Sequence, residues 1–193
     1  MQYIKTDSNI TLQQYDEQLV LCRDIFVKKL QDYGMSWRVM RPRSFTDQLF
    51  IKAQRIRTLE DTGINKVGDG IEGEFIALVN YGLMALIQLE NGISDDVDNT
   101  ISGDAAVNLF NHHAREVRAI MLRKNHDYGE AWRDMRISSF IDLILTKILR
   151  IKQIENNEGK TLISEGLDGH YTDIINYAMF ALIRLNYTNP TKA

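Results

Sequence analysis

Cysteine and proline are both scarce in this chain, which has one cysteine, Cys22, and two prolines, Pro42 and Pro190, in 193 residues. A single cysteine cannot form an intrachain disulfide or a cysteine-based zinc site, so we expect a protein of the reducing cytoplasm. Proline interrupts helices, and both prolines lie outside the long periodic segments, so nearly the whole chain is free to be helical. A run of about 18 apolar residues, the length that spans a bilayer, is also absent, so we expect no membrane partner.

A strong positive charge is absent as well. The chain has 23 Lys and Arg against 26 Asp and Glu, a net charge of −3. Without a broad positive field, a role in coating DNA or RNA is disfavoured, although a local basic patch stays open. Hydrophobic residues make up 44% and charged residues 25%, the mix of a soluble globular protein.

An internal repeat organises the chain. Residues 29–61 and 124–156 are identical at 15 of 33 positions, and residues 70–89 and 166–185 at 8 of 20. The first pair is offset by 95 positions and the second by 96, so one residue is inserted between them. This agreement indicates a tandem duplication.

The repeat predicts how the domains are organised. We expect a first helical repeat at 1–90, a linker at 91–103 and a second helical repeat at 104–193. Each copy alone would be a marginal domain, so we expect the halves to share one core, like a homodimer fused into one chain. The halves can pair within a chain or between chains, so a homo-oligomer stays open.

Apolar spacing at three and four residues predicts three helices in each copy, and no segment alternates like a strand. Ser44 with Asp47, and Ser139 with Asp142, resemble capping boxes that begin the second helix of each copy. We therefore expect an all-α fold, a tandem duplication of a three-helix unit packed as a pseudo-two-fold six-helix body. The expected helices are 11–32, 44–60, 69–90, 105–125, 139–155 and 164–187.

Polar side chains present in both copies need a reason other than core packing. One set follows the first helix: a glycine marks a turn, Tyr and Trp can stack on a nucleobase, and Arg can hold a phosphate. The alternative is a loop whose aromatic rings fill the core and whose Asp and Arg pair with each other. The set is Asp32, Tyr33, Gly34, Trp37 and Arg41 in the first copy, and Asp127, Tyr128, Gly129, Trp132 and Arg136 in the second.

A basic pair lies on the second helix of each copy, Lys52 with Arg55 and Lys147 with Arg150. A spacing of three places both cations on one helix face, beside an apolar stripe. Such cations either reach solvent or meet an anion. The anion is either a ligand phosphate or the acidic third helix, in which case the pair forms structural salt bridges.

Carboxylates begin the third helix of the second copy. Positions 165, 168, 172 and 176 share one face, with Asp173 at its edge, so Glu165, Asp168 and Asp173 are candidate ligands for Mg²⁺. The alternative is that the acids complement the helix dipole. In the first copy Ala77 replaces the third acid, so we expect the second copy to carry any chemistry, unless each site draws on both halves.

These motifs resemble a known family. DYG-x-x-W, S-F-x-D-x-x-x-x-K-x-x-R-I and E-x-x-D followed by D-I-I-N-Y-A resemble the nucleotide modification associated domain family, over nearly the whole chain. A more distant similarity is to all-α NTP pyrophosphohydrolases of the MazG and dimeric dUTPase type. Their E-x-x-D half matches Glu165 and Asp168, but Lys147 and Arg150 stand where their E-x-x-E half belongs.

The resemblance implies a nucleotide, or a related phosphate-bearing small molecule, as ligand. Our leading hypothesis is a Mg²⁺-dependent hydrolase in which Glu165, Asp168 and Asp173 hold the metal and carry catalysis. The alternatives are a nucleotide-binding module without catalysis and a helical scaffold. The candidate substrate-binding residues are Lys147, Arg150, Asn176, Asp127, Tyr128, Trp132, Arg136, Lys52, Arg55 and Trp37.

Overall fold

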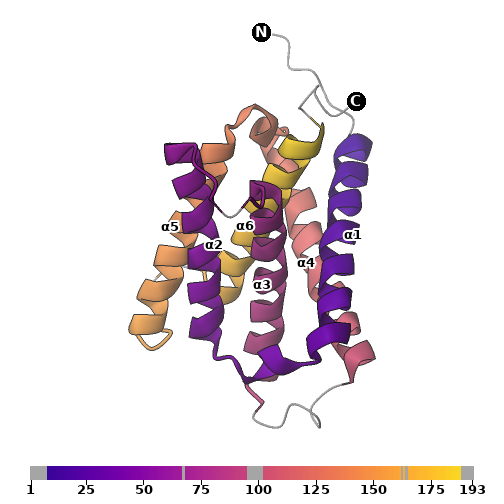
Figure 1. Ribbon diagram of the computed structural model, residues 1–193, viewed down its shortest axis with the longest axis vertical. Coiled ribbons are helices and arrows are strands. Elements are labelled where there is room, and N and C mark those ends of the chain that lie inside the picture. The colour runs from indigo at the N-terminus through magenta and orange to yellow at the C-terminus, as the bar shows by residue number, and fades with distance from the viewer. Residues whose placement is uncertain (1–7, 67, 95–101, 162, 164, 188–193) are drawn as a thin grey trace.

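The structure, a computed structural model, consists of helices joined by loops over the part of the chain that it describes, residues 8–66, 68–94, 102–161, 163 and 165–187. Within these residues there are six α-helices, two short 3-10 helices and no strand (Figure 1), so the all-α prediction is confirmed. The elements are α1 Ser8–Tyr33, η1 Ser36–Val39, α2 Pro42–Thr62, α3 Ile71–Asn91, α4 Gly103–Tyr128, η2 Ala131–Asp134, α5 Ile137–Asn156 and α6 Leu167–Tyr187.

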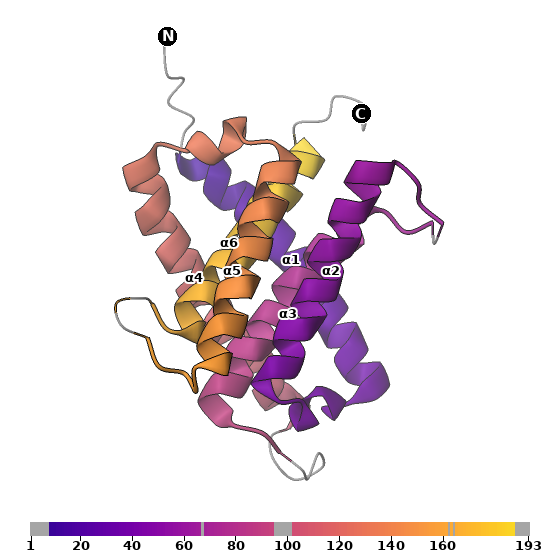
Figure 2. The same cartoon turned by 90° about the vertical axis from the view of Figure 1, so that its left-hand side faces the viewer.

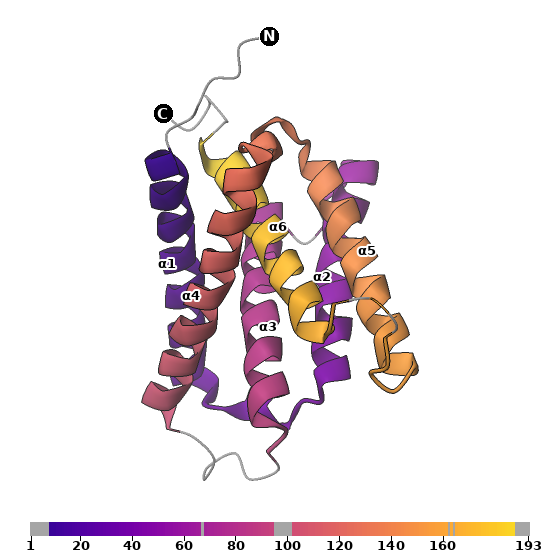
Figure 3. The same ribbon diagram turned by 180° about the vertical axis from the view of Figure 1, so that it is seen from behind.

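The helices form three layers. Helices α3 and α6 lie in the middle and pack against each other (Figure 1). Helices α2 and α5 lie side by side on one side of them (Figure 2). Helices α1 and α4 cover the opposite side (Figure 3). Each layer therefore contains one helix from each repeat, as a pseudo-two-fold body requires.

The two repeats are packed into each other. Helix α1 contacts both α3 and α6, and α4 likewise contacts both α6 and α3. The buried apolar side chains of both repeats form one continuous cluster. The first helix of each repeat thus covers the third helix of the other, so neither half can bury its core alone.

The middle layer owes its position to its sequence. Helices α3 and α6 are apolar around most of their circumference, the composition of helices buried on all sides. They also approach closely, since a Cβ at Gly82 would lie 2.6 Å from Cγ1 of Ile175. Only glycine fits at that point of contact.

The predicted starts of the second helices are wrong by two residues. Helix α2 begins at Pro42 with Arg41 as N-cap, and α5 begins at Ile137 with Arg136 as N-cap, in both cases without a side-chain capping bond. Proline at the first helical position is preorganised for a helix, so α2 starts there. Ser44 and Ser139 therefore lie inside the first turn and form no capping box.

Other predictions about local structure agree with the coordinates. Gly34 and Gly129 have φ values of 59° and 60°, so each forms the expected left-handed turn after the first helix of its repeat. Cys22 is fully buried, as a small core residue. Part of the expected linker, residues 95–101, lies outside the described residues. No helix among those described has the length and hydrophobicity needed to cross a membrane.

Candidate functional site

A cavity of about 590 Å³ opens in the first repeat between α1, η1 and α3. Aromatic side chains form much of its wall, namely Phe26, Tyr33, Trp37 and Tyr81. Lys29 is the only charged residue in the part of its lining that the structure describes. Concave, mostly apolar sites with a few polar groups are typical of small-molecule binding. The repeat allows each lining residue to be compared with its equivalent in the second repeat.

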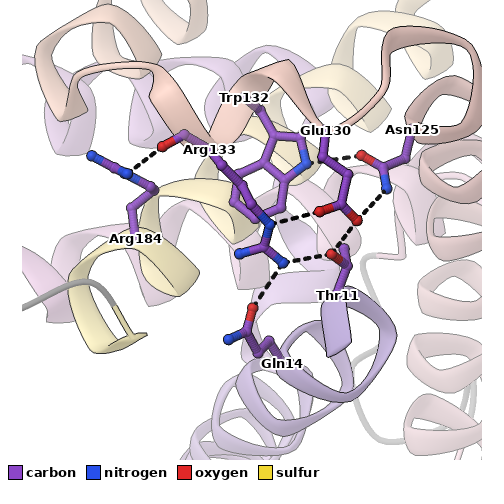
Figure 4. Close-up of polar contacts among 7 residues, drawn as sticks. All are labelled: Thr11, Gln14, Asn125, Glu130, Trp132, Arg133 and Arg184. Atoms are coloured by element: carbon purple, nitrogen blue, oxygen red, sulfur yellow. Dashed lines mark hydrogen bonds and ion pairs between the residues drawn. The ribbon is translucent and has the colours of Figure 1, made fainter. Parts of the chain in front are cut away.

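The indole nitrogen of Trp37 has lost the partner that its equivalent has. In the second repeat, Trp132 Nε1 donates a hydrogen bond to Asn125 Oδ1 at 2.8 Å (Figure 4). Leu30 occupies the position of Asn125 in the first repeat and also lines the cavity. Trp37 is 8% exposed, and its Nε1 has no hydrogen-bond partner among the described residues. An unpaired buried donor costs free energy unless a ligand satisfies it.

The amide oxygen of Asn80 has lost its partner in the same way. Asn176 donates to the backbone oxygen of Val117 and accepts a hydrogen bond from the hydroxyl of Tyr15 at 2.9 Å. Asn80 makes the equivalent donation, to the backbone oxygen of Cys22 at 2.9 Å. Phe110 stands at the position equivalent to Tyr15, and Asn80 Oδ1 has no partner within the described part of the chain. The first repeat thus keeps a buried acceptor unsatisfied.

The ammonium group of Lys29 is the third group without its expected partner. Its equivalent, Lys124, bonds to Asp173 Oδ1 at 2.6 Å. Ala77 replaces that aspartate in the first repeat and lines the cavity. Lys29 forms no ion pair with any described residue. A cation at the cavity is therefore available to an anionic ligand.

An aromatic ring fills the equivalent space in the second repeat. Phe180 stacks on Trp132 with ring centroids 4.4 Å apart and an interplanar angle of 7°. Met84 takes the place of Phe180 and lines the cavity beside Trp37. The first repeat thus has space beside an indole where the second repeat places a stacked ring.

The second repeat is closed further by a polar network around Glu130, shown in Figure 4. Glu130 accepts hydrogen bonds from Arg133 at 2.7 Å, from Asn125 at 3.1 Å and from Thr11 of α1. Burial opposes ionisation of Glu130, but these hydrogen bonds outweigh it and lower its pKa. Met35, at the position of Glu130, is buried and cannot form such a network. Closure therefore depends on Glu130 and Asn125, which Met35 and Leu30 replace in the first repeat, together with Thr11 from the first repeat.

The predicted basic pair of the first repeat forms salt bridges. Lys52 Nζ lies 3.2 Å from Glu74 Oε2, and Arg55 bonds to Glu74 Oε1. Glu74 is buried, and its equivalent in the second repeat is His170. Of the two anions considered for these cations, the acidic third helix supplies the partner, so neither faces the cavity as a free cation.

In the second repeat the carboxylate lies one turn further along the third helix. Lys147 Nζ bonds to Asp173 Oδ2 at 2.5 Å, and Lys124 holds the other oxygen. Burial opposes ionisation of Asp173, but the hydrogen bonds from the two lysines outweigh it and lower its pKa. Arg150 is exposed. Lys147 thus forms an ion pair. Asn176 is buried and accepts a hydrogen bond from the hydroxyl of Tyr15.

The three acids predicted to bind magnesium do not form one cluster. Glu165 lies before α6, and it groups with Asp173 and His170, whose ligand atoms are within 4.8 Å of one another. Asp168 instead lines a separate groove with His113 and Arg123. Both oxygens of Asp173 are bound by ammonium groups, which repel a divalent cation. As arranged, Glu165, Asp168 and Asp173 do not fit a single Mg²⁺ ion.

Most residues of the predicted loop set lie at the surface. Asp127, Tyr128 and Arg136 are exposed, and Asp127 interacts with its neighbour His126 at 3.2 Å rather than with Arg136. The tryptophans behave differently, because Trp37 and Trp132 are both buried. The alternative in which the aromatic residues fill the core therefore describes the tryptophans and not the tyrosines.

The burial of His170 predicts that the protein becomes less stable at acidic pH. Burial, followed by the charge of Lys147, lowers its pKa below the ordinary 6.5. In the unfolded chain this histidine is protonated near pH 6.5, whereas in the folded chain it is protonated only at a lower pH. The free energy of unfolding therefore falls as the pH drops from about 6.5 to the pKa of folded His170. Urea unfolding at about pH 7.5 and about pH 5.5 measures this. We expect the free energy of unfolding to change less between these pH values in His170→Gln than in the unsubstituted protein. His126→Gln, an exposed control, should behave like the unsubstituted protein. An equal change in all three proteins would contradict the prediction.

Sequence reasoning missed Lys29, Asn80, Ala77 and Met84 as a group. The first two were visible as residues shared by both copies. The signal that marks the cavity is the loss of their partners, which requires knowing the contacts in the other repeat. A comparison of shared residues alone cannot show it.

Comparison with known proteins identifies a family. The family model described as nucleotide modification associated domain 1 matches twice, over residues 29–89 and 124–185. The two matches coincide with the two repeats. No curated protein and no solved structure matches the chain.

Proposed function

Because the chain belongs to the nucleotide modification associated domain 1 family, we propose that it binds a nucleotide, with the base in the cavity of the first repeat. One observation carries this proposal. Trp37, Asn80 and Lys29 line one cavity, and each lacks the partner that its equivalent has in the second repeat. Two buried polar atoms without a partner and an exposed lysine around one space favour a ligand in that space.

The chemistry of the three groups describes the ligand. A planar ring would stack on Trp37 in the space that Phe180 fills beside Trp132. The indole N–H lies in the plane of its ring, so an acceptor on another part of the ligand, such as a sugar hydroxyl, would take the hydrogen bond from Trp37 Nε1, as Asn125 and not Phe180 does at Trp132. An amino group of the base would donate to Asn80 Oδ1. Lys29 would hold the phosphate. A nucleotide combines all three features.

A titration of the tryptophan variants tests the proposal. Trp37→Phe keeps an aromatic ring but removes the N–H donor, so we expect nucleotide affinity to fall about 2- to 10-fold, the value of one hydrogen bond. Calorimetry with the common ribo- and deoxyribonucleotides measures the affinity. In Trp132→Phe, Trp37 is the only tryptophan, so quenching of its fluorescence on titration reports a ring stacked on it.

The two repeats serve as each other's control in this experiment. If affinity falls in Trp132→Phe and not in Trp37→Phe, the base binds in the second repeat and the assignment to the first-repeat cavity is wrong. Heat from no nucleotide with the intact protein would reject nucleotide binding altogether.

Magnesium-dependent hydrolysis stays a separate prediction. Glu165 and Asp173 lie near each other beside His170, but Asp173 would first have to leave Lys124 and Lys147. Incubating nucleoside triphosphates with Mg²⁺ and assaying for the monophosphate and pyrophosphate tests it directly. Binding without turnover would support the non-catalytic nucleotide-binding module. The cavity of the first repeat alone would be sufficient for such binding. A homo-oligomer likewise stays a prediction.

A further inference from the structure

The charges around the first-repeat cavity restrict the number of phosphates on its ligand. Resting on the proposed function, we infer that this cavity selects a nucleoside monophosphate over the corresponding triphosphate. Among the described residues its lining supplies one cation, Lys29, and no other charged side chain. A terminal phosphate monoester carries a charge of about −1.5 to −2 at pH 7, of which one lysine offsets about half to two-thirds.

The basic pair on the second helix of the first repeat is not free to bind further phosphates. Lys52 and Arg55, the basic pair of the first repeat, both bind the buried carboxylate of Glu74. Withdrawing either cation would leave Glu74, which is 5% exposed, with a poorly balanced buried charge. Neither residue lines the cavity. A second or third phosphate would thus add negative charge for which the described lining of the cavity has no further cation.

The pairing of charges in the second repeat supports the same restriction on the number of phosphates. There the equivalent lysine, Lys124, and the helix lysine, Lys147, share a single carboxylate, Asp173. In the first repeat Ala77 stands in place of that aspartate. Lys29 therefore has no ion-pair partner among the described residues, and Lys52 pairs with Glu74 instead. The first repeat thus has a carboxylate for its helix lysine but none that pairs with Lys29 among the described residues, and a ligand with one phosphate would supply that anion.

A charge series tests the inference. For each common base, the nucleoside, monophosphate and triphosphate are titrated by calorimetry without added metal. We expect the monophosphate to bind about tenfold more tightly than the nucleoside or the triphosphate, one power of ten in Kd. Lys29→Gln should reduce the monophosphate to the affinity of the nucleoside. The matched control Lys28→Gln removes a neighbouring charge that does not line the cavity and should leave the preference intact.

The outcomes separate this inference from the proposed function. A triphosphate that binds as tightly as the monophosphate, or more tightly, would overturn the selection while leaving nucleotide binding in place. An unchanged preference in Lys29→Gln would also overturn it. Binding of none of the compounds would instead reject the proposed function.

Discussion

Asp173→Ala is expected to lower the free energy of unfolding by about 3 kcal/mol, the lower end of the range for breaking a buried ion pair. The Asp173 carboxylate is 8% exposed and Lys147 is 14% exposed, so Lys147 would be left charged and poorly hydrated. Lys124 is 49% exposed and can turn to solvent, which limits the loss. For a chain of this size the melting temperature should fall by about 6–12 °C.

The first repeat supplies the rescue for this variant. There Glu74, one turn before Ala77, neutralises the helix lysine. His170→Glu together with Asp173→Ala copies that arrangement into the second repeat, so we expect it to regain at least half of the lost stability. Asp127→Ala, at an exposed position, should change stability by no more than about 0.5 kcal/mol. Failure of the double variant to improve on Asp173→Ala would show that the two ion pairs are not interchangeable.

Closing the first-repeat cavity is expected to weaken ligand binding and raise stability together. Met84→Phe places a ring beside Trp37, as Phe180 lies beside Trp132, and Leu30→Asn supplies the acceptor that Asn125 provides. Filling a cavity commonly adds about 0.5–2 kcal/mol of stability. Nucleotide affinity should fall at least about tenfold, because the new ring occupies the place of the base.

Two measurements on one sample decide this prediction. Thermal unfolding gives the stability and calorimetry gives the affinity. A destabilised protein that no longer binds would be uninformative about the site, so Leu30→Asn alone serves as the milder variant: it should weaken binding by competing for the Trp37 donor. Full affinity in the stable double variant would place the nucleotide elsewhere.

The fold was largely predictable because its signals are local or repeated. Apolar spacing gave six helices, and the duplication gave their pairing into a pseudo-two-fold body. The start of α2 was not predicted, because Ser44 followed by Asp47 suggests a cap, whereas Pro42 at the first helical position begins the helix. Two helix-start signals competed, and nothing in the sequence ranks them.

The candidate site was predicted only in part. The sequence drew attention to shared polar residues, and Trp37 is one of them. It directed the chemistry to the second repeat because Asp173 has no counterpart in the first repeat, where Ala77 stands, but in space that aspartate forms an ion pair with two lysines. An acidic residue at a helix edge is compatible with a metal ligand or a salt bridge, and only the position of the lysines decides between them.

The crossed packing of the outer helices bears on how the chain can be cut and rejoined. Helix α1 lies against α6 near the end of the chain, where the Tyr187 hydroxyl bonds to Glu17 and Asn186 bonds to Gln18 at 3.0 Å. A circular permutant opened between α3 and α4 and joined between α6 and α1 would have the repeats in reverse order. Every helix would keep its neighbours, since the pseudo-two-fold exchanges the two halves. Connectivity is therefore a dispensable part of this architecture, whereas interpenetration of the halves is not.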